Sequence, residues 1–311
     1  MGALTLAQAS LLSQDKLIMG IAKEILTIDS FADQLVFVPA NGKALVHDRE
    51  LTESGATFLD VGGTSNATQA TVTQITQPLG RISGDVIVDD FAQATLSHDN
   101  DQTATQMTLK SKAIGRTWKD AVITGTGTFP QFTGISNLMA TSQVIQASAT
   151  TSGASMTLAL LDQLGDQVTA KDGELDFYTM NLTLKRKYQA LVRSQGFTNA
   201  EVEIGFLNPI TGQRGTRLIL AYDSVPIFSN DYIATESTNG SPGKHRVFAG
   251  VFGEQIGVTG ITPRDGNSGI RVTAPFHSET KDETIRRLKM YTGLALFSTK
   301  ALAELSNLLG T

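Results

Sequence analysis

Cysteine is absent from the 311 residues of this chain, and histidine is scarce. The absence of cysteine excludes a thiol nucleophile, a thiolate-bound zinc or iron–sulfur site and a disulfide scaffold. The four histidines, His47, His98, His245 and His277, form neither an HExxH motif nor another pair at metal-ligand spacing. No serine lies in a GxSxG element. We therefore expect no catalytic residue, no metal site, no cofactor and no enzymatic activity.

Excess charge and long apolar runs are also lacking. The net charge is −5, from 25 basic and 30 acidic residues, which argues against a surface that holds nucleic acid by counterion release. No window reaches the roughly 20 apolar residues of a membrane span. The N-terminal stretch is apolar but has no basic opening, and it is interrupted by Asp15, Lys16, Lys23 and Glu24. We expect a soluble, unprocessed chain with no membrane partner.

Glycine is plentiful, and the stretch ITGTGTFPQFTG at residues 123–134 suggests a phosphate-binding loop. Such a loop works when backbone N–H groups at the start of a helix point at the anion, so its glycines come after a strand and precede a helix. Here they come after a predicted helix, and Pro130 stands where GxGxxG requires its third glycine. The stretch is predicted to end the helix and to connect it to the next element of the chain.

Two further motifs fail on their spacing. SPGKH at residues 241–245 resembles part of a Walker loop, but Thr238 and His245 replace the required glycine and Ser or Thr, so we expect an exposed turn. The acidic run HDND at residues 98–101 lacks the glycine and glutamate that a calcium loop needs further on, and it is predicted to cap a helix. His277, near Glu279, is expected in a surface turn.

The first ninety residues are predicted to form a helix and then an arm. Apolar residues recur at helical spacing over residues 5–26, so a helix is expected there. Residues 35–90 contain two runs rich in Val, Ile and Thr around a turn-rich middle, which predicts a two-stranded arm with a loose tip. The strands carry polar residues on both faces, and an isolated hairpin is marginal in water. The arm is therefore expected to lie on another surface, such as a second copy of the chain.

The clearest helix extends from about residue 98 to 124. It is predicted to end at Gly125. Its apolar stripe has helical spacing and consists of Ala104, Met107, Ile114, Trp118, Ala121 and Val122.

A compact α+β unit is predicted beyond Thr150. Its helices are TLALLDQLGDQV and LTLKRKYQALVRSQG, and its strands are DFYTM, RLILAYDSVPIF and HRVFAGVF. The basic run Lys185, Arg186 and Lys187 is expected to be a solvated helix face, with contact to a neighbour as the alternative. The tail is predicted as a hairpin turning near Asp265 and Gly266, a long strand, and a short closing helix.

This order of elements resembles the major capsid proteins of tailed bacteriophages, which have the Hong Kong 97 type fold. The resemblance covers essentially the whole chain. It is strongest in LTLAQASLLSQDKL, DVIVDDF, KAIGRTWKDAVITGTGTFPQFTGISNLM and IRRLKMYTGLALFSTKALAEL, although none of these motifs is diagnostic by itself.

The resemblance implies an α+β Hong Kong 97 type capsid fold with four parts. These are an N-terminal arm at residues 1–38, an extended E-loop at 39–89, a peripheral domain at 90–144 and 247–311 with its spine helix at about 98–124, and an axial domain at 145–246. Lys43, the single lysine between residues 24 and 109, lies near the base of the predicted arm, so covalent cross-linking is not expected.

The resemblance also implies partners. The chain would assemble with itself into hexamers and pentamers of an icosahedral shell, in the host bacterial cytoplasm, to become the capsid of a virion. The family's fused N-terminal scaffold is not seen, which implies a separate scaffolding protein or a trimmed form. A portal is also expected, with a decoration protein as a further candidate, and double-stranded DNA would be enclosed without sequence-specific binding.

Three classes of function remain open from the sequence. The first is a phage capsid subunit. The second is an encapsulin, a bacterial compartment of the same fold that encloses a cargo enzyme; the predicted helix at 5–26 fits it, whereas the long polar arm favours the phage. The third is an enzyme with an unrecognised site, which no cluster of titratable residues supports.

Overall fold

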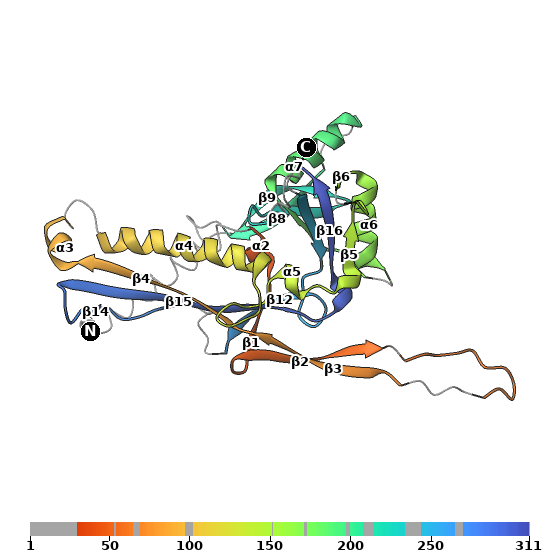
Figure 1. Ribbon diagram of the computed structural model, residues 1–311, viewed down its shortest axis with the longest axis horizontal. Coiled ribbons are helices and arrows are strands. Elements are labelled where there is room, and N and C mark those ends of the chain that lie inside the picture. Colours follow the sequence, from red (N-terminus) through yellow and green to blue (C-terminus); the bar gives the residue numbers. More distant parts are fainter. Residues whose placement is uncertain are drawn as a thin grey trace, which may run out of the picture.

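The computed structural model describes residues 30–52, 54–64, 69–96, 102–150, 152–170, 173–196, 200–207, 214–233, 244–264 and 270–310. The helix predicted at 5–26 lies outside the described residues. Two mixed β-sheets and a separate two-stranded ribbon make up the strands. In Figure 1 the first sheet and a long helix form an elongated unit on the left, the second sheet forms a compact unit at upper right, and the ribbon projects towards the lower right.

The first sheet has six strands and is built around the long strand β15 (Glu283–Leu296). β4 (Gly80–Asp89) pairs antiparallel with β15 along its whole length, from Thr292↔Gly80 to Glu283↔Asp89. The other strands of this sheet are β1 (Phe37–Ala40), β12 (Val258–Pro263), β13 (Ile270–Val272) and β14 (Phe276–His277).

The turn predicted near Asp265 and Gly266 lies outside the described residues. β12, β13 and β14 on either side of it all pair antiparallel with β15, so these three strands run in one direction. The chain reverses between β14 and β15, where the Ser278 amide donates to the Glu283 carbonyl over 3.0 Å.

The long helix α4 (Gln102–Thr124) covers one face of the first sheet. It ends immediately before Gly125, as predicted. Most of the predicted stripe is buried, with Met107, Ile114, Trp118 and Val122 each 5% exposed or less, whereas Ala104 is exposed. The Trp118 indole N–H donates to the Thr292 hydroxyl over 3.3 Å, which ties the helix to β15. The short helices of the described residues are α2 (Ser30–Gln34), α3 (Asp90–Leu96), α5 (Ile135–Leu138), η1 (Thr141–Gln143) and η2 (Thr299–Ala301).

The second sheet has eight strands in the order β5-β16-β11-β7-β10-β9-β8, with β6 also paired to β16. These strands are β5 (Val144–Gln146), β6 (Ala154–Ser155), β7 (Phe177–Met180), β8 (Glu201–Leu207), β9 (Arg214–Tyr222), β10 (Val225–Ser229), β11 (Lys244–Gly250) and β16 (Leu302–Leu309). The helices α6 (Leu158–Thr169) and α7 (Leu182–Ser194) form at the predicted positions, and the Asn181 side chain caps α7 by accepting from the Leu184 amide.

Successive side chains of β11 point to opposite faces of the second sheet and belong to two different hydrophobic clusters. Val247 and Ala249 pack with the buried residues of α6 and α7, so both helices cover one face of the second sheet. Phe248 belongs to the other cluster, which also contains Trp118 of α4. In that cluster Phe31 of α2 contacts Phe177 with ring centroids 5.2 Å apart. One core therefore joins the second sheet to the spine helix.

The predicted closing helix is wrong, because β16 is a strand. Leu305 and Leu308 both pack beneath α6 and α7 although they are three residues apart, a spacing that resembles a helix. The register explains this: His245 and Val247 of β11 pair with Leu308 and Leu305, so β16 carries one extra residue there. β16 belongs to the second sheet, in which it pairs with β11, β5 and β6.

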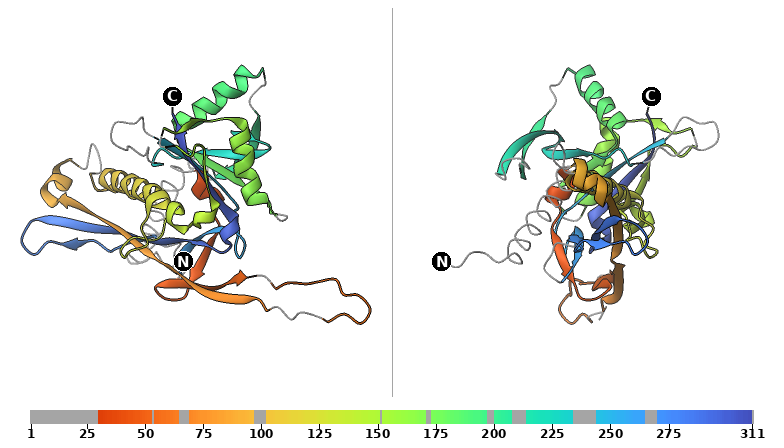
Figure 2. Two further views of the ribbon diagram at one scale, coloured as in Figure 1. Left: turned by 45° about the vertical axis from the view of Figure 1, so that its right-hand side comes forward. Right: turned by 90° about the vertical axis from the view of Figure 1, so that its left-hand side faces the viewer.

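The ribbon consists of β2 (Ala44–Thr52) and β3 (Thr71–Pro78), paired antiparallel from Ala44↔Pro78 to Thr52↔Thr71. The E-loop expected over residues 39–89 contains this ribbon and also β4, which pairs with β15 in the first sheet. Both views of Figure 2 show the ribbon beneath the two sheet units.

Candidate assembly surface

The ribbon β2–β3, with the residues 54–64 that continue from β2, is the candidate assembly surface and is called the arm below. Along β3 only Gln77 is buried, and the other side chains are exposed or half-buried. The apolar side chains of Val46 and Val72 are 51% and 64% exposed. A two-stranded sheet without a covering layer is marginally stable in water. The arm therefore gains little from burial within its own subunit.

The tip of the arm exposes large apolar side chains. Residues 54–64 are all exposed, and Phe58 and Val61 are 108% and 102% accessible, while Leu59 is 53% accessible. Leaving such side chains in water forgoes about 1.5–3 kcal/mol each that burial would supply. Apolar groups gathered at the end of a projecting segment mark an interaction site more often than a solvated loop.

The arm is fixed to the body by Arg49, which pairs with Thr73 of β3. Its Nε donates to the Phe297 carbonyl over 2.6 Å, and its Nη2 donates to the Leu296 carbonyl. The adjacent His47 ring packs on the Phe297 ring with centroids 4.6 Å apart. Arg49 therefore uses two donors to join β2 to the end of β15, and the arm leaves the body in a defined direction.

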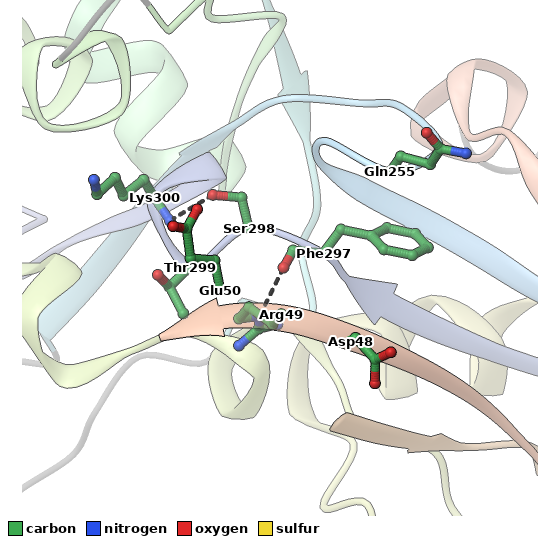
Figure 3. A pocket seen from close by; sticks show the side chains of 8 residues that line it. All are labelled: Asp48, Arg49, Glu50, Gln255, Phe297, Ser298, Thr299 and Lys300. Carbon is green, nitrogen blue, oxygen red and sulfur yellow. Dashed lines mark hydrogen bonds between the residues drawn. The ribbon is translucent and has the colours of Figure 1, made fainter. Parts of the chain in front are cut away.

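A polar cleft of about 360 Å³ lies beside this contact. Figure 3 shows Arg49 at its floor, directed at the Phe297 carbonyl, with Asp48 and Glu50 on the same strand and Gln255 on the opposite side. Burial lowers the pKa of Arg49 from its ordinary value, and burial followed by the charge of Arg49 lowers the pKa of His47. These shifts result from packing at the base of the arm, and the cleft contains no nucleophile paired with a base.

The glycine stretch at residues 123–134 connects α4 to α5 and makes no anion cradle. The Gly134 amide donates to the Gly125 carbonyl over 2.8 Å, and the Gly127 amide donates to the Phe132 carbonyl over 3.1 Å. A Cβ on Gly125 would lie 2.4 Å from the Phe132 carbonyl oxygen. These backbone donors are bonded within the loop, so the prediction of a helix end and connector is confirmed.

The sequence contains four histidines, and the three that the structure describes lie on different strands. His47 lies at the base of the arm, and His277 is exposed on β14, 3.2 Å from an Asp90 carboxylate oxygen. His245 is buried in β11 and bonded to the Asn181 side chain, so the exposed turn expected at SPGKH is wrong at this residue. Pairing of β11 with β16 and β7 buries the position. His98 lies outside the described residues.

No group of three or more His, Asp or Glu side chains in the described part of the chain is placed to hold a metal ion. None of the described helices is long and apolar enough to cross a bilayer. Sequence reasoning missed Arg49, because its two acceptors are main-chain carbonyls 247 and 248 residues away. The one sequence feature that could have indicated Arg49 is an arginine within a strand of mixed polarity. Such arginines are too common for this feature to assign a role.

The two sheets, the helix α4 between them and the projecting ribbon define the α+β Hong Kong 97 type capsid fold, as the sequence predicted. No protein-family model matches the sequence, and no curated protein matches it. Solved structures do match. The holo-SrpI encapsulin complex from Synechococcus elongatus PCC 7942 is 18% identical, with a TM-score of 0.66 over 89% of this chain and 86% of that one.

Two other similar structures come from a GTA particle and from a phage, and not from an encapsulin. The capsid of a native GTA particle is 15% identical, with a TM-score of 0.60 over 92% of this chain and 90% of that one. A structure from Mycobacterium phage Ogopogo is 13% identical, with a TM-score of 0.58 over 89% of this chain and 91% of that one. At these identities the similarity establishes the fold.

Proposed function

We propose that this chain is the structural subunit of an icosahedral bacteriophage capsid, a self-assembling shell that encloses packaged double-stranded DNA. The observation that carries the proposal is the arm on a Hong Kong 97 type fold. Its strand β2 is fixed to the body by Arg49, and its tip presents Phe58 and Val61 fully to solvent. A rigidly aimed arm with an apolar end is built to bury that end on another subunit.

A shell role accounts for the rest of the molecule without an enzymatic one. An arm of one copy that docks on a different surface of the next makes a heterologous contact, and such contacts close into rings when the rotation allows it. Obligate interfaces of this kind bury roughly 2,000–5,000 Å². A closed shell retains DNA by enclosure, so the subunit does not need a strongly basic surface, in agreement with the net charge of −5.

On this proposal the first-sheet unit with α4 is the peripheral domain, the second-sheet unit is the axial domain, and the arm is the E-loop. The partners are further copies in hexamers and pentamers, a scaffolding protein, a portal and optionally a decoration protein. Assembly takes place in the cytoplasm of the bacterial host, and the mature location is the virion.

The second candidate is the shell of an encapsulin nanocompartment that encloses a cargo enzyme. The similarity to an encapsulin complex over 89% of the chain supports it. The long arm, with apolar residues at its tip, supports the phage capsid, as do the similar phage structures. Both candidates share the shell role and differ in what the shell contains.

Negative-stain electron microscopy of the purified full chain tests the shell role. We expect closed particles of icosahedral shape. A monomer that persists at high protein concentration and in high salt, with catalytic turnover on a substrate, would overturn the proposal for both candidates.

The contents of particles isolated from the native source distinguish the two candidates. Nuclease-resistant double-stranded DNA extracted from intact particles is expected for the phage capsid. A single co-purifying enzyme, with no protected nucleic acid, would instead identify an encapsulin.

A further inference from the structure

A cavity of about 370 Å³ lies in the second-sheet unit, between α6 and the turn that joins β9 to β10. Three carboxylates line it: Asp162 and Asp166 on α6, one turn apart, and Asp223 in the turn. Tyr178 of β7 and Tyr222 of β9 also line it, with ring centroids 6.0 Å apart. It is called the acidic pocket below.

The negative charge of the acidic pocket is not neutralised within the described part of the subunit. The Tyr222 hydroxyl donates to one oxygen of Asp162. No cationic side chain among the described residues pairs with Asp162, Asp166 or Asp223. Three carboxylates around one cavity repel one another, and a bound cation would relieve that repulsion.

A second observation also indicates a ligand. The Tyr178 side chain is 2% exposed, and its hydroxyl has no hydrogen-bond partner among the described residues. The hydroxyl points towards Gly165 of α6, where a Cβ would lie 2.9 Å from its oxygen. The hydroxyl is not one of the fully buried unpaired atoms of the described residues, so it opens onto the cavity and can bond a ligand there. Burial, followed by the nearby carboxylates, raises the pKa of Tyr178, so its hydroxyl stays protonated beside the cavity.

These groups select an organic cation that donates hydrogen bonds. Carboxylate oxygens accept from a guanidinium or an ammonium group, and the faces of tyrosine rings attract the same cations. The three carboxylates are not placed to hold a metal ion. An arginine side chain matches best, because its planar fork of donors can serve two carboxylates at once.

The chain presents such side chains on α7. This helix carries Lys185, Arg186, Lys187 and Arg193 and no acidic residue, whereas α6 carries Asp162 and Asp166 and no basic residue. Arg186 and Arg193 are exposed, lie two turns apart on one side of α7, and have no partner among the described residues. Figure 1 shows α7 across the top of the second-sheet unit and α6 along its right-hand side. One domain therefore carries a basic helix and an acidic pocket at different edges.

We propose that an α7 arginine, Arg186 or Arg193, of one copy occupies the acidic pocket of a second copy. The contact is heterologous, because α7 of one subunit meets α6 of the next, and repetition of such a contact gives a ring. This inference rests on the proposed shell function and names the residues that join second-sheet units within it.

Neutralising the pocket tests the proposal. Neither Asp166 nor Asp223 makes a side-chain hydrogen bond among the described residues, and asparagine tolerates the positive φ of 47° at Asp223, so D166N/D223N is expected to fold with unchanged or higher thermal stability. We expect its self-association, measured by sedimentation velocity, to weaken at least about tenfold, which is the effect of losing a charge-assisted pair. E201Q/E203Q, on exposed positions of β8, changes the net charge equally and is expected to assemble as wild type.

Charge exchange identifies the partner. We expect R186E/R193E and D166R/D223R each to assemble poorly, and the chain with all four changes to recover assembly. Recovery in the fourfold variant supports the direct pairing. Poor assembly of both parents without recovery overturns it, as does normal assembly of D166N/D223N.

The two proposals fail in distinguishable ways. Closed wild-type particles together with normal assembly of D166N/D223N would leave the shell function standing and overturn the pairing. Wild-type self-association into open chains that depends on Asp166 and Asp223 would support the pairing and overturn the closed shell. A wild-type chain that does not self-associate at all would overturn both.

Discussion

Arg49 on the arm donates hydrogen bonds to the main-chain carbonyls of Phe297 and Leu296, so one side chain fixes the arm to the end of the longest strand. Both carbonyls lie at the point where β15 gives way to the turn before β16. The direction in which the arm projects therefore depends on a side chain that can bind two acceptors at once.

Arg49→Ala is expected to loosen the arm and to leave two part-buried carbonyls without these donors. We expect a loss of about 1–3 kcal/mol in the free energy of unfolding. Hydrogen exchange should become faster across residues 44–52 and 71–78. Arg49→Lys keeps the charge but cannot bridge both carbonyls, so an intermediate effect is expected. Unchanged exchange in Arg49→Ala would show that strand pairing alone orders the arm.

Phe58→Ser combined with Val61→Ser is expected to abolish assembly without affecting folding. Both side chains are fully exposed, so the free energy of unfolding of the isolated subunit should change by less than about 0.5 kcal/mol. Thermal unfolding measures the change in stability, and particle yield in electron micrographs measures assembly. Thr57→Ser, at another exposed position of the tip, is the control. Wild-type particle yield from the double variant would remove the tip from the interface.

Gly134→Ala is expected to destabilise the connector after α4. The new Cβ would lie 2.6 Å from the Gly125 amide nitrogen and 2.7 Å from the Ala121 carbonyl oxygen, so the backbone must shift, at a cost of about 1–3 kcal/mol. Gly205→Ala is the matched control, because a Cβ there meets nothing within 4 Å, and its effect should stay within about 1 kcal/mol. Denaturant unfolding compares the two, and equal effects would contradict the steric argument.

His245 is expected to make stability depend on pH. Burial, and then the charge of Lys187, lowers the pKa of His245 from its ordinary value of 6.5. The Asn181 oxygen accepts from the Leu184 amide, so its nitrogen donates to His245 Nδ1, which must be unprotonated. The unfolded chain then takes up a proton at a higher pH than the folded chain does, so stability falls as the pH drops below about 6.5.

Urea titrations between pH 7.5 and 5 measure this effect. The pKa of His47 is also lowered, mainly by burial, and it contributes a loss of the same sign. His245→Gln is expected to flatten part of the decline, and adding His47→Phe should flatten it further while keeping a ring against Phe297. A decline of equal slope in the wild type and the double variant would assign it to other groups.

Local sequence patterns correctly predicted the elements in which the spacing of apolar residues agrees with the face that the structure buries. The α4 stripe around Met107, Ile114 and Trp118 has helical spacing, and the structure buries it. Asn181 begins α7 because its side chain can accept from the helix N-terminus, which is a property of the residue and its neighbours. The resemblance to a capsid family supplied the arrangement of these elements, which no local pattern contains.

The errors arose where distant parts of the chain decide the outcome. The extra residue in β16 gives Leu305 and Leu308 a helical spacing inside a strand, and only pairing with β11 reveals it. Arg49 and the acidic pocket were missed for the same reason. Asp162 and Asp223 belong to different elements and are unremarkable in sequence, and they converge only after the second sheet has formed.

The arm and the first sheet share a continuous backbone, since Leu79 alone separates β3 from β4. With about 3.3 Å per residue, β3 spans about 26 Å, and Arg49, which pairs with Thr73 near its far end, ties the ribbon to the end of β15. In the proposed shell, a neighbour that holds residues 54–64 would therefore pull on β15 through Arg49 and on β4 through Leu79. A change in the curvature of the first sheet of one subunit would then be transmitted to the next.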